Sequence, residues 1–176
     1  MTSEGSYRVV VPAQAVAKGR ARFQKNGRAF TPAKTVAAEA WVRLCCVDQV
    51  GTPRVPGPVA VRIVYVMPIP KSMTKALQAQ ARANALMPTR KPDWDNLAKL
   101  TSDALNGIAW RDDAEVASAQ AWKVYGAEPC TVLAWWTLTP EAAQAEVARA
   151  WAEVGGPGLA RGGYGRVQAA LAASLL

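Results

Sequence analysis

The chain has 176 residues, 51% of them hydrophobic, so it can bury the core of one ordinary domain and is not expected to be disordered. Its net charge of +8 favours a polyanionic partner, although a generally basic, solvated surface is an equal alternative. It has no histidine, and its three cysteines include an adjacent pair and no C-x-x-C spacing, which argues against a zinc site and a disulfide framework.

The first third of the chain predicts a strand, a basic loop and a helix. Tyr7 to Val11 is a β-branched run that ends at Pro12 and reads as a strand. Basic residues crowd the stretch from 18 to 28, where Asn-Gly indicates a tight turn. Thr31 is the expected N-cap of a helix over about 33–50. The periodicity of that helix places four apolar residues on one face: Val36, Ala40, Leu44 and Val47.

The middle of the chain predicts a buried strand and two helices. Residues 59–67 are apolar on both faces, as in a central strand covered on each side. Ser72 is placed to cap a polar helix that runs to about Leu86. The next helix begins after Pro92 and stops at Asn106-Gly107. Its apolar residues form one buried stripe: Leu97, Leu100, Thr101, Ala104, Leu105 and Ile108.

Two more strands, over 115–125 and 131–138, complete the predicted sheet. After Pro140 the composition changes to an Ala/Glu helix over 141–154, a Gly-rich link over 155–165 and a short terminal helix over 166–176. The order of elements predicts an α/β or α+β fold, a small mixed β-sheet with helices packed on it. We therefore expect a domain over residues 1–139 and a helical extension over 140–176.

The most informative stretch is Lys91-Pro-Asp-Trp-Asp-Asn-Leu-Ala-Lys99. Asp95 and Lys99 are four residues apart on one helical face, with Asp93 at the helix mouth and Asp112-Asp113 just after the helix. Clustered oxygen ligands suit Mg²⁺ or Mn²⁺. For one aspartate alone, helix capping is the better interpretation, and Asp112-Asp113 alone would read as a solvated turn. Paired aspartates also occur in glycosyltransferases and phosphatases, so the spacing does not name a substrate.

The chain resembles the RusA family of Holliday-junction resolvases over about residues 7–138. The resemblance rests on three segments that together are specific: Arg90-Lys-Pro-Asp-Trp-Asp-Asn-Leu-Ala-Lys99, Asp103-Ala-Leu-Asn-Gly-Ile and Trp110-Arg-Asp-Asp113. Lys18-Gly-Arg-Ala-Arg22 with the downstream Thr31-Pro32 resembles many members as well. The family fold and activity are expectations that follow from this resemblance.

By position, the resemblance implies that Asp93, Asp95 and Asp113 are the metal-binding catalytic carboxylates and that Lys99 is the catalytic lysine. Asp112 is then accessory and Asp103 structural. The implied enzyme is a Mg²⁺-dependent homodimer, with Mn²⁺ as a substitute, that nicks a four-way junction symmetrically and leaves 5′-phosphate and 3′-hydroxyl ends. The implied DNA-binding residues grip backbone phosphates: Lys18, Arg20, Arg22, Lys25, Arg28, Arg90 and Lys91.

Several alternatives stay open at this stage. Arg90 and Lys91 could simply balance the carboxylates, and Trp94 could stack on an unpaired base or, as we expect, pack on the sheet. The protein as a whole could be an idle DNA-binding architectural dimer or a phosphohydrolase of small molecules. We expect no membrane span and no signal peptide, hence a cytoplasmic, nucleoid-associated protein; resolvases of this type often travel on phages.

Overall fold

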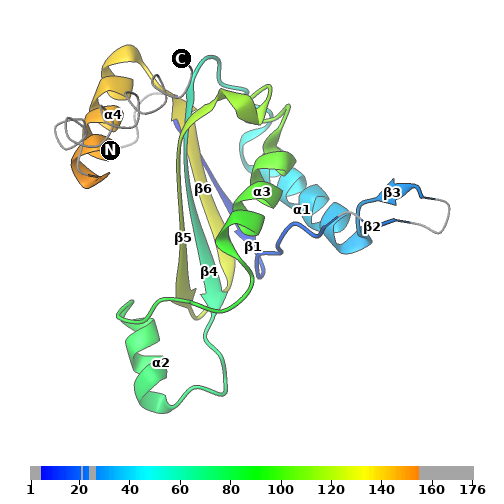
Figure 1. Cartoon of the computed structure of the whole chain (residues 1–176), viewed down its shortest axis with the longest axis vertical. Coiled ribbons are helices and arrows are strands. Elements are labelled where there is room, and N and C mark those ends of the chain that lie inside the picture. Colours follow the sequence, from blue (N-terminus) through cyan, green and yellow to red (C-terminus); the bar gives the residue numbers. More distant parts are fainter. Residues whose placement is uncertain (1–4, 21, 24–26, 155–176) are drawn as a thin grey trace, which may run out of the picture. The chain divides into compact units, whose positions relative to one another are not determined.

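The computed structural model describes residues 5–20, 22–23 and 27–154, and residues 1–137 and 138–176 form two separate units. The first unit is built around a four-stranded sheet with a small hairpin beside it (Figure 1). Its elements are β1 (Tyr7–Pro12), β2 (Arg22–Phe23), β3 (Ala29–Phe30), α1 (Ala33–Val50), β4 (Val59–Pro68), α2 (Lys75–Arg82), α3 (Trp94–Leu105), the 3₁₀ turn η1 (Asp113–Glu115), β5 (Val116–Gly126) and β6 (Cys130–Thr137).

The sheet is mixed, as predicted, with the strand order β1-β6-β4-β5. The strand β4 pairs antiparallel with β6 and parallel with β5, so Ile63 lies between Leu133 and Ala121. Although β5 and β6 follow each other in the chain, they are not neighbours, because β4 lies between them. The chain therefore passes through α2 and α3 between the parallel strands β4 and β5. This connection brings α3 next to these two strands, where the candidate site lies.

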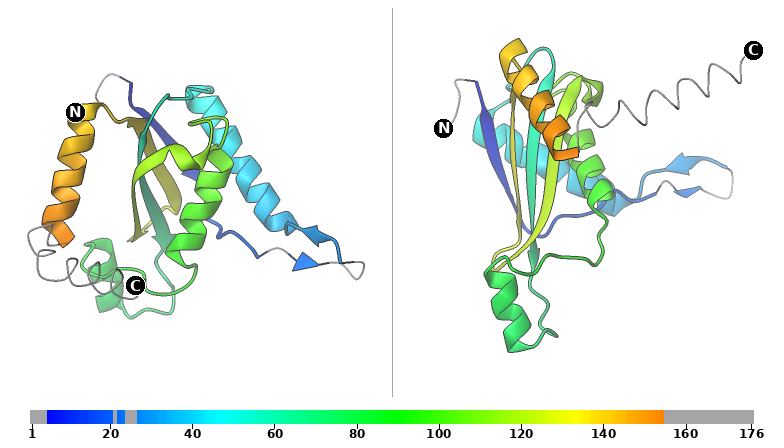
Figure 2. Two further views of the ribbon diagram at one scale, coloured as in Figure 1. Left: turned by 45° about the horizontal axis from the view of Figure 1, so that its top comes forward. Right: turned by 60° about the vertical axis from the view of Figure 1, so that its left-hand side comes forward.

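Both long helices of the first unit pack on the same face of the sheet, α1 beside β1 and α3 beside β5 (Figure 2). The side chains of β4 that face the helices are buried, and those of the other face are mostly half-exposed. The prediction that this strand is covered on both sides is therefore wrong for the first unit. A run that is apolar on both faces can belong to a central strand with helices on only one side, since the second face tolerates partial exposure.

The helix α1 has the predicted bounds, but its buried face is not the predicted stripe. Thr35, Val42 and the two adjacent cysteines are buried, whereas the Val36, Ala40, Leu44 and Val47 stripe is exposed. The period was correct, but this helix is apolar on more than one face, and only the sheet decides which of them is covered. Its N-cap is Pro32, with no side-chain cap, so Thr31 does not have the expected role.

The other helices of this unit differ from the predictions mainly at their ends. Thr74, not Ser72, caps α2, and its side chain accepts a hydrogen bond from the backbone N–H of Leu77 at 3.3 Å. This helix ends at Arg82, and Asn84 just beyond it has a positive φ of 55°, a conformation typical of helix termini. The predicted stripe of α3 is confirmed, since the residues named for it within the helix are buried.

The second unit contains the helix α4 (Pro140–Val154). At the start of α4, Thr139 Oγ1 accepts a hydrogen bond from the backbone N–H of Ala142 at 3.2 Å. Further along the helix, Arg149 forms an ion pair with Glu146 at 2.7 Å. The predicted link over 155–165 and the terminal helix over 166–176 lie outside the described residues. The three cysteines are free, and no helix in the described part of the chain is long and apolar enough to cross a membrane.

Candidate functional site

The segment before α3 is held on the sheet by a lysine that was not among the predicted site residues. Lys123 of β5 donates hydrogen bonds from Nζ to the carbonyl oxygens of Arg90 and Pro92, both at 2.8 Å. These two bonds tie the helix entry to the edge strand, which fixes where the following aspartates emerge. The signal in the sequence was a lysine inside a strand, next to aromatic and apolar residues.

The two aspartates at the start of α3 are exposed, and capping does not account for both of them. Asp93 occupies the N-cap position in an extended conformation, but its side chain makes no cap hydrogen bond. Asp95 lies in the first turn and forms no ion pair with Lys99 among the described residues. Both carboxylates therefore keep their oxygens open to solvent, although the helix dipole favours negative charge at this end.

The two residues of the second acidic pair, Asp112 and Asp113, have different surroundings. Asp112 accepts a hydrogen bond at Oδ1 from the backbone N–H of Ala114 at 2.9 Å and so caps η1. Asp113 is exposed, and its side chain makes no hydrogen bond within the described residues. Arg111 and Glu115 brace the same turn, with Nη2 and Oε1 3.0 Å apart. This arrangement suits the accessory role expected for Asp112.

The acidic motif consists of the stretch 93–99 and the pair Asp112-Asp113. One cavity of about 340 Å³ is lined by residues from both parts of it. It lies between α3 and the strands β4 and β5, and Trp94, Lys99 and Asp113 all line it. Trp94 is 62% exposed, which argues against the expectation that its ring packs on the sheet. In the folded chain, Asp113 therefore lies on the same side of α3 as Lys99.

The structure does not place the three predicted metal ligands, Asp93, Asp95 and Asp113, around one metal position. Asp93 and Asp95 do not line the cavity that Asp113 lines, and the described residues contain no group of three or more acidic or cysteine side chains placed to hold a metal ion. Exposed carboxylates repel one another, and here Asp93 and Asp95 lie at the start of α3 whereas Asp113 lies in η1. Their chemistry as hard oxygen donors still matches Mg²⁺ or Mn²⁺.

Lys18 is the predicted DNA-binding residue whose surroundings differ most from the prediction. Its Nζ lies 2.5 Å from Glu39 Oε1 and 2.6 Å from Asp103 Oδ2, with only 23% of the side chain exposed. Burial alone would lower the pKa of Lys18, but hydrogen bonds and charge attraction from Asp103 and Glu39 outweigh it and raise the pKa. Lys18 therefore joins the basic loop to α1 and α3, which favours a structural role over a phosphate contact.

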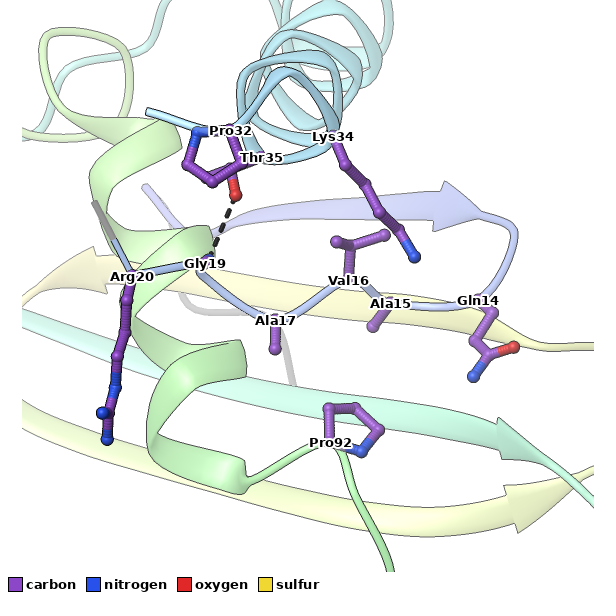
Figure 3. Close-up of a pocket in the computed structure, with 10 residues that line it drawn as sticks. All are labelled: Gln14, Ala15, Val16, Ala17, Gly19, Arg20, Pro32, Lys34, Thr35 and Pro92. Atoms are coloured by element: carbon purple, nitrogen blue, oxygen red, sulfur yellow. Dashed lines mark hydrogen bonds between the residues drawn. The ribbon is translucent and has the colours of Figure 1, made fainter. Parts of the chain in front are cut away.

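The basic loop frames a second cavity, of about 510 Å³, with the start of α1 (Figure 3). Arg20 and Lys34 both line it, and both side chains are exposed. The backbone N–H of Gly19 donates to Thr35 Oγ1 at 3.1 Å. A Cβ at position 19 would lie 2.8 Å from that oxygen, so this close approach needs glycine.

The remaining predicted DNA contacts lie in the hairpin region and in the segment before α3. Arg28, Arg90 and Lys91 are exposed. Lys25 lies outside the described residues, and only the backbone of Arg22, in β2, is described. Lys34 was not predicted as a contact, although a lysine in the first turn of a helix beside a basic loop was a usable signal.

A pair of substitutions separates the structural lysine from the arginine beside it. We expect Lys18→Ala to lower the free energy of unfolding by about 1–2 kcal/mol, because Glu39 and Asp103 would be left facing each other. We expect Arg20→Ala to change the free energy of unfolding by less than about 0.5 kcal/mol. The slope of log affinity for DNA against log salt concentration should fall by about the amount that one phosphate contact contributes. Urea unfolding and binding at several salt concentrations measure the two effects. The reverse outcome would return Lys18 to the DNA-binding surface.

Comparison with known proteins adds family information to this geometry. The sequence profile of the family described as endodeoxyribonuclease RusA matches residues 12–134, a range that contains both acidic segments, Lys99 and the basic loop. An uncharacterized protein of Bacillus subtilis (strain 168), YqaN, is 34% identical over 119 residues, which cover 65% of this chain and 84% of the relative.

Proposed function

The chain belongs to the RusA family of endodeoxyribonucleases, and from that premise we propose that it resolves Holliday junctions by paired, symmetric nicks. The observation that carries this proposal is the meeting of Lys99 and Asp113 at one cavity beside the helix start that bears Asp93 and Asp95. A cation beside carboxylates that are free to bind a divalent metal is the set of groups that metal-assisted hydrolysis of a phosphodiester uses.

We propose Mg²⁺ as the cofactor, with Mn²⁺ as a substitute, held by oxygens of Asp93, Asp95 and Asp113. The fit is chemical: the three carboxylates are exposed, none is used in a hydrogen bond or ion pair within the described residues, and hard oxygen donors suit these ions. When bound, such an ion supplies a Lewis acid and lowers the pKa of water. The Lys99 ammonium would stabilise the negative charge that develops on the scissile phosphate.

The products follow from attack of water on phosphorus. The bond between phosphorus and the 3′ oxygen breaks, the oxygen of water joins the phosphate, and the leaving 3′ oxygen takes a proton. The ends are a 5′-phosphate and a 3′-hydroxyl, which a ligase can seal. Exposed basic side chains would hold the DNA through its backbone phosphates: Arg20, Arg28, Lys34, Arg90 and Lys91.

A homodimer suits this function because a four-way junction offers two equivalent strands and a twofold dimer offers two equivalent sites. The exposed apolar stripe of α1 supports a second copy of the chain as a partner. Val36, Leu44 and Val47 are 52%, 58% and 45% exposed, and a partner helix or sheet could bury them. We place the protein in the cytoplasm, where its DNA substrate is, and regard a phage origin as compatible with this function.

The experiment that tests the proposal is cleavage of synthetic four-way junctions. With Mg²⁺ or Mn²⁺, we expect nicks at symmetric positions on two opposing strands, no cleavage of linear duplex, and no activity after chelation of the metal. Tight junction binding with no nicks under any metal would identify an architectural DNA-binding protein instead. Hydrolysis of small phosphate esters, with DNA affinity that barely changes with salt, would identify a phosphohydrolase.

A further inference from the structure

The cavity beside Lys99 and Asp113 exists because the sequence places small residues on both of its walls. Its volume of about 340 Å³ falls in the range of small-molecule sites, roughly 300–1,000 Å³. The small side chains are Ala98 and Ser102 on α3 and Ala119 and Ala121 on β5. Larger residues at these positions would fill the space between the helix and the edge strand, so the hollow is a property of this sequence.

The floor of the cavity is apolar and firmly packed. Val61 and Ile63 are each 4% exposed and Trp110 is 1% exposed. The ring N–H of Trp110 donates to Asn106 Oδ1 at 2.8 Å, so its polar atom is satisfied outside the cavity. An occupant would therefore meet an apolar surface at the bottom, which favours a ring with apolar faces.

The mouth of the cavity has a different character. Trp94 is 62% exposed there, and it shares one face of α3 with Ala98 and Ser102, since the three are four residues apart. The hydroxyl of Ser102 has no hydrogen-bond partner among the described residues, so it can donate to or accept from the polar edge of an occupant. Lys99 and Asp113, which the proposed function places at the scissile phosphate, line the same cavity.

We propose that this cavity takes up one nucleobase next to the scissile phosphate, unstacked from the junction, with the Trp94 ring stacked on it. The proposal rests on the proposed nuclease function and adds to it a base-binding site. Every base has a π-face that an aromatic ring can stack on, and bases near a branch point cost less to unstack than bases inside a duplex. Holding the base would also position the adjoining phosphate against Lys99.

The test combines protein variants with junctions that lack one base. An abasic residue is placed in turn on each side of the cut, and cleavage and binding are measured. For the wild-type protein we expect one of these positions to lower cleavage by about 10- to 100-fold. We expect Trp94→Ala to show the same loss on the intact junction and no further loss on the abasic one, because the two changes remove one shared contact. Trp94→Phe should retain most of the activity.

Two further variants make the test specific. Ala98→Leu fills the cavity without removing the ring and should reproduce the loss, whereas Trp122→Ala, which removes a 42%-exposed tryptophan that does not line the cavity, should not. Circular dichroism confirms that each variant is folded. Wild-type cleavage by both Trp94→Ala and Ala98→Leu, or equal sensitivity of wild type and Trp94→Ala to the abasic residue, would overturn the proposal.

The binding measurements separate this proposal from the proposed function. They are made in the Asp95→Asn background, which should bind junctions without cutting them. If the wild-type protein nicks no junction, the proposed function fails, while an effect of the missing base on affinity that requires Trp94 would still support the base site. A second outcome is that junctions are nicked normally, but removing the base has the same effect on affinity and rate with and without Trp94. In that case the proposed base site is wrong and the proposed nuclease function stands.

Discussion

Asp95→Asn is expected to lower junction cleavage by about 10³-fold or more and to leave junction binding unchanged or tighter. The substitution keeps the shape of the side chain but removes a negative charge that repels phosphate and a strong ligand for a divalent cation. Asp95 is exposed in the first turn of α3, so the fold should tolerate the change at a cost of at most about 1 kcal/mol from the helix dipole. Single-turnover cleavage and equilibrium binding on the same junction measure the two effects.

The matched control is Asp48→Asn, which removes an exposed aspartate from α1 that lines neither of the two cavities. It should cleave at the wild-type rate. If Asp95→Asn also cleaves at that rate in Mg²⁺, Asp95 is not a metal ligand, and the assignment of the acidic motif fails with it. Substitution of Asp113 by asparagine should give a comparable loss, whereas Asp112→Asn should mainly loosen the turn that it caps.

Lys99→Ala is expected to lower the rate of cleavage by about 10²–10³-fold, the usual effect of removing one group that stabilises transition-state charge. The ammonium lines the cavity together with Asp113 and has no ion-pair partner among the described residues, so it is available to a phosphate. Binding should weaken only slightly, because one phosphate contact is a small share of a junction interface. Lys99→Arg should recover part of the rate, since the charge remains but its geometry changes.

A lysine on another helix provides the comparison for Lys99. Lys75 in α2 is exposed, and its replacement by alanine should leave the single-turnover rate unchanged. The informative contrary result for Lys99→Ala is a normal rate combined with weaker, less salt-dependent binding. That outcome would make Lys99 a backbone anchor and would shift the stabilisation of the transition state to another cation.

The sequence by itself determined the elements whose signals are local. The period of α3, its stop at Asn106-Gly107 and the existence of the strand β4 all depend on residues within one turn or one strand, so they were correctly predicted. The acidic motif was also visible, because Asp95 and Lys99 share a face by helix geometry alone. The absence of histidine already directed any metal chemistry to carboxylates.

Only the tertiary structure decided which of these features meet. It placed β4 between β5 and β6 and buried one apolar face of α1 while leaving another exposed. It also paired Lys18, a predicted phosphate contact, with Glu39 and Asp103. It opened a cavity where alanines of β5 face α3, with Trp94 at the mouth. Such contacts join residues far apart in the chain, and local periodicity contains no information about which partner a face will find.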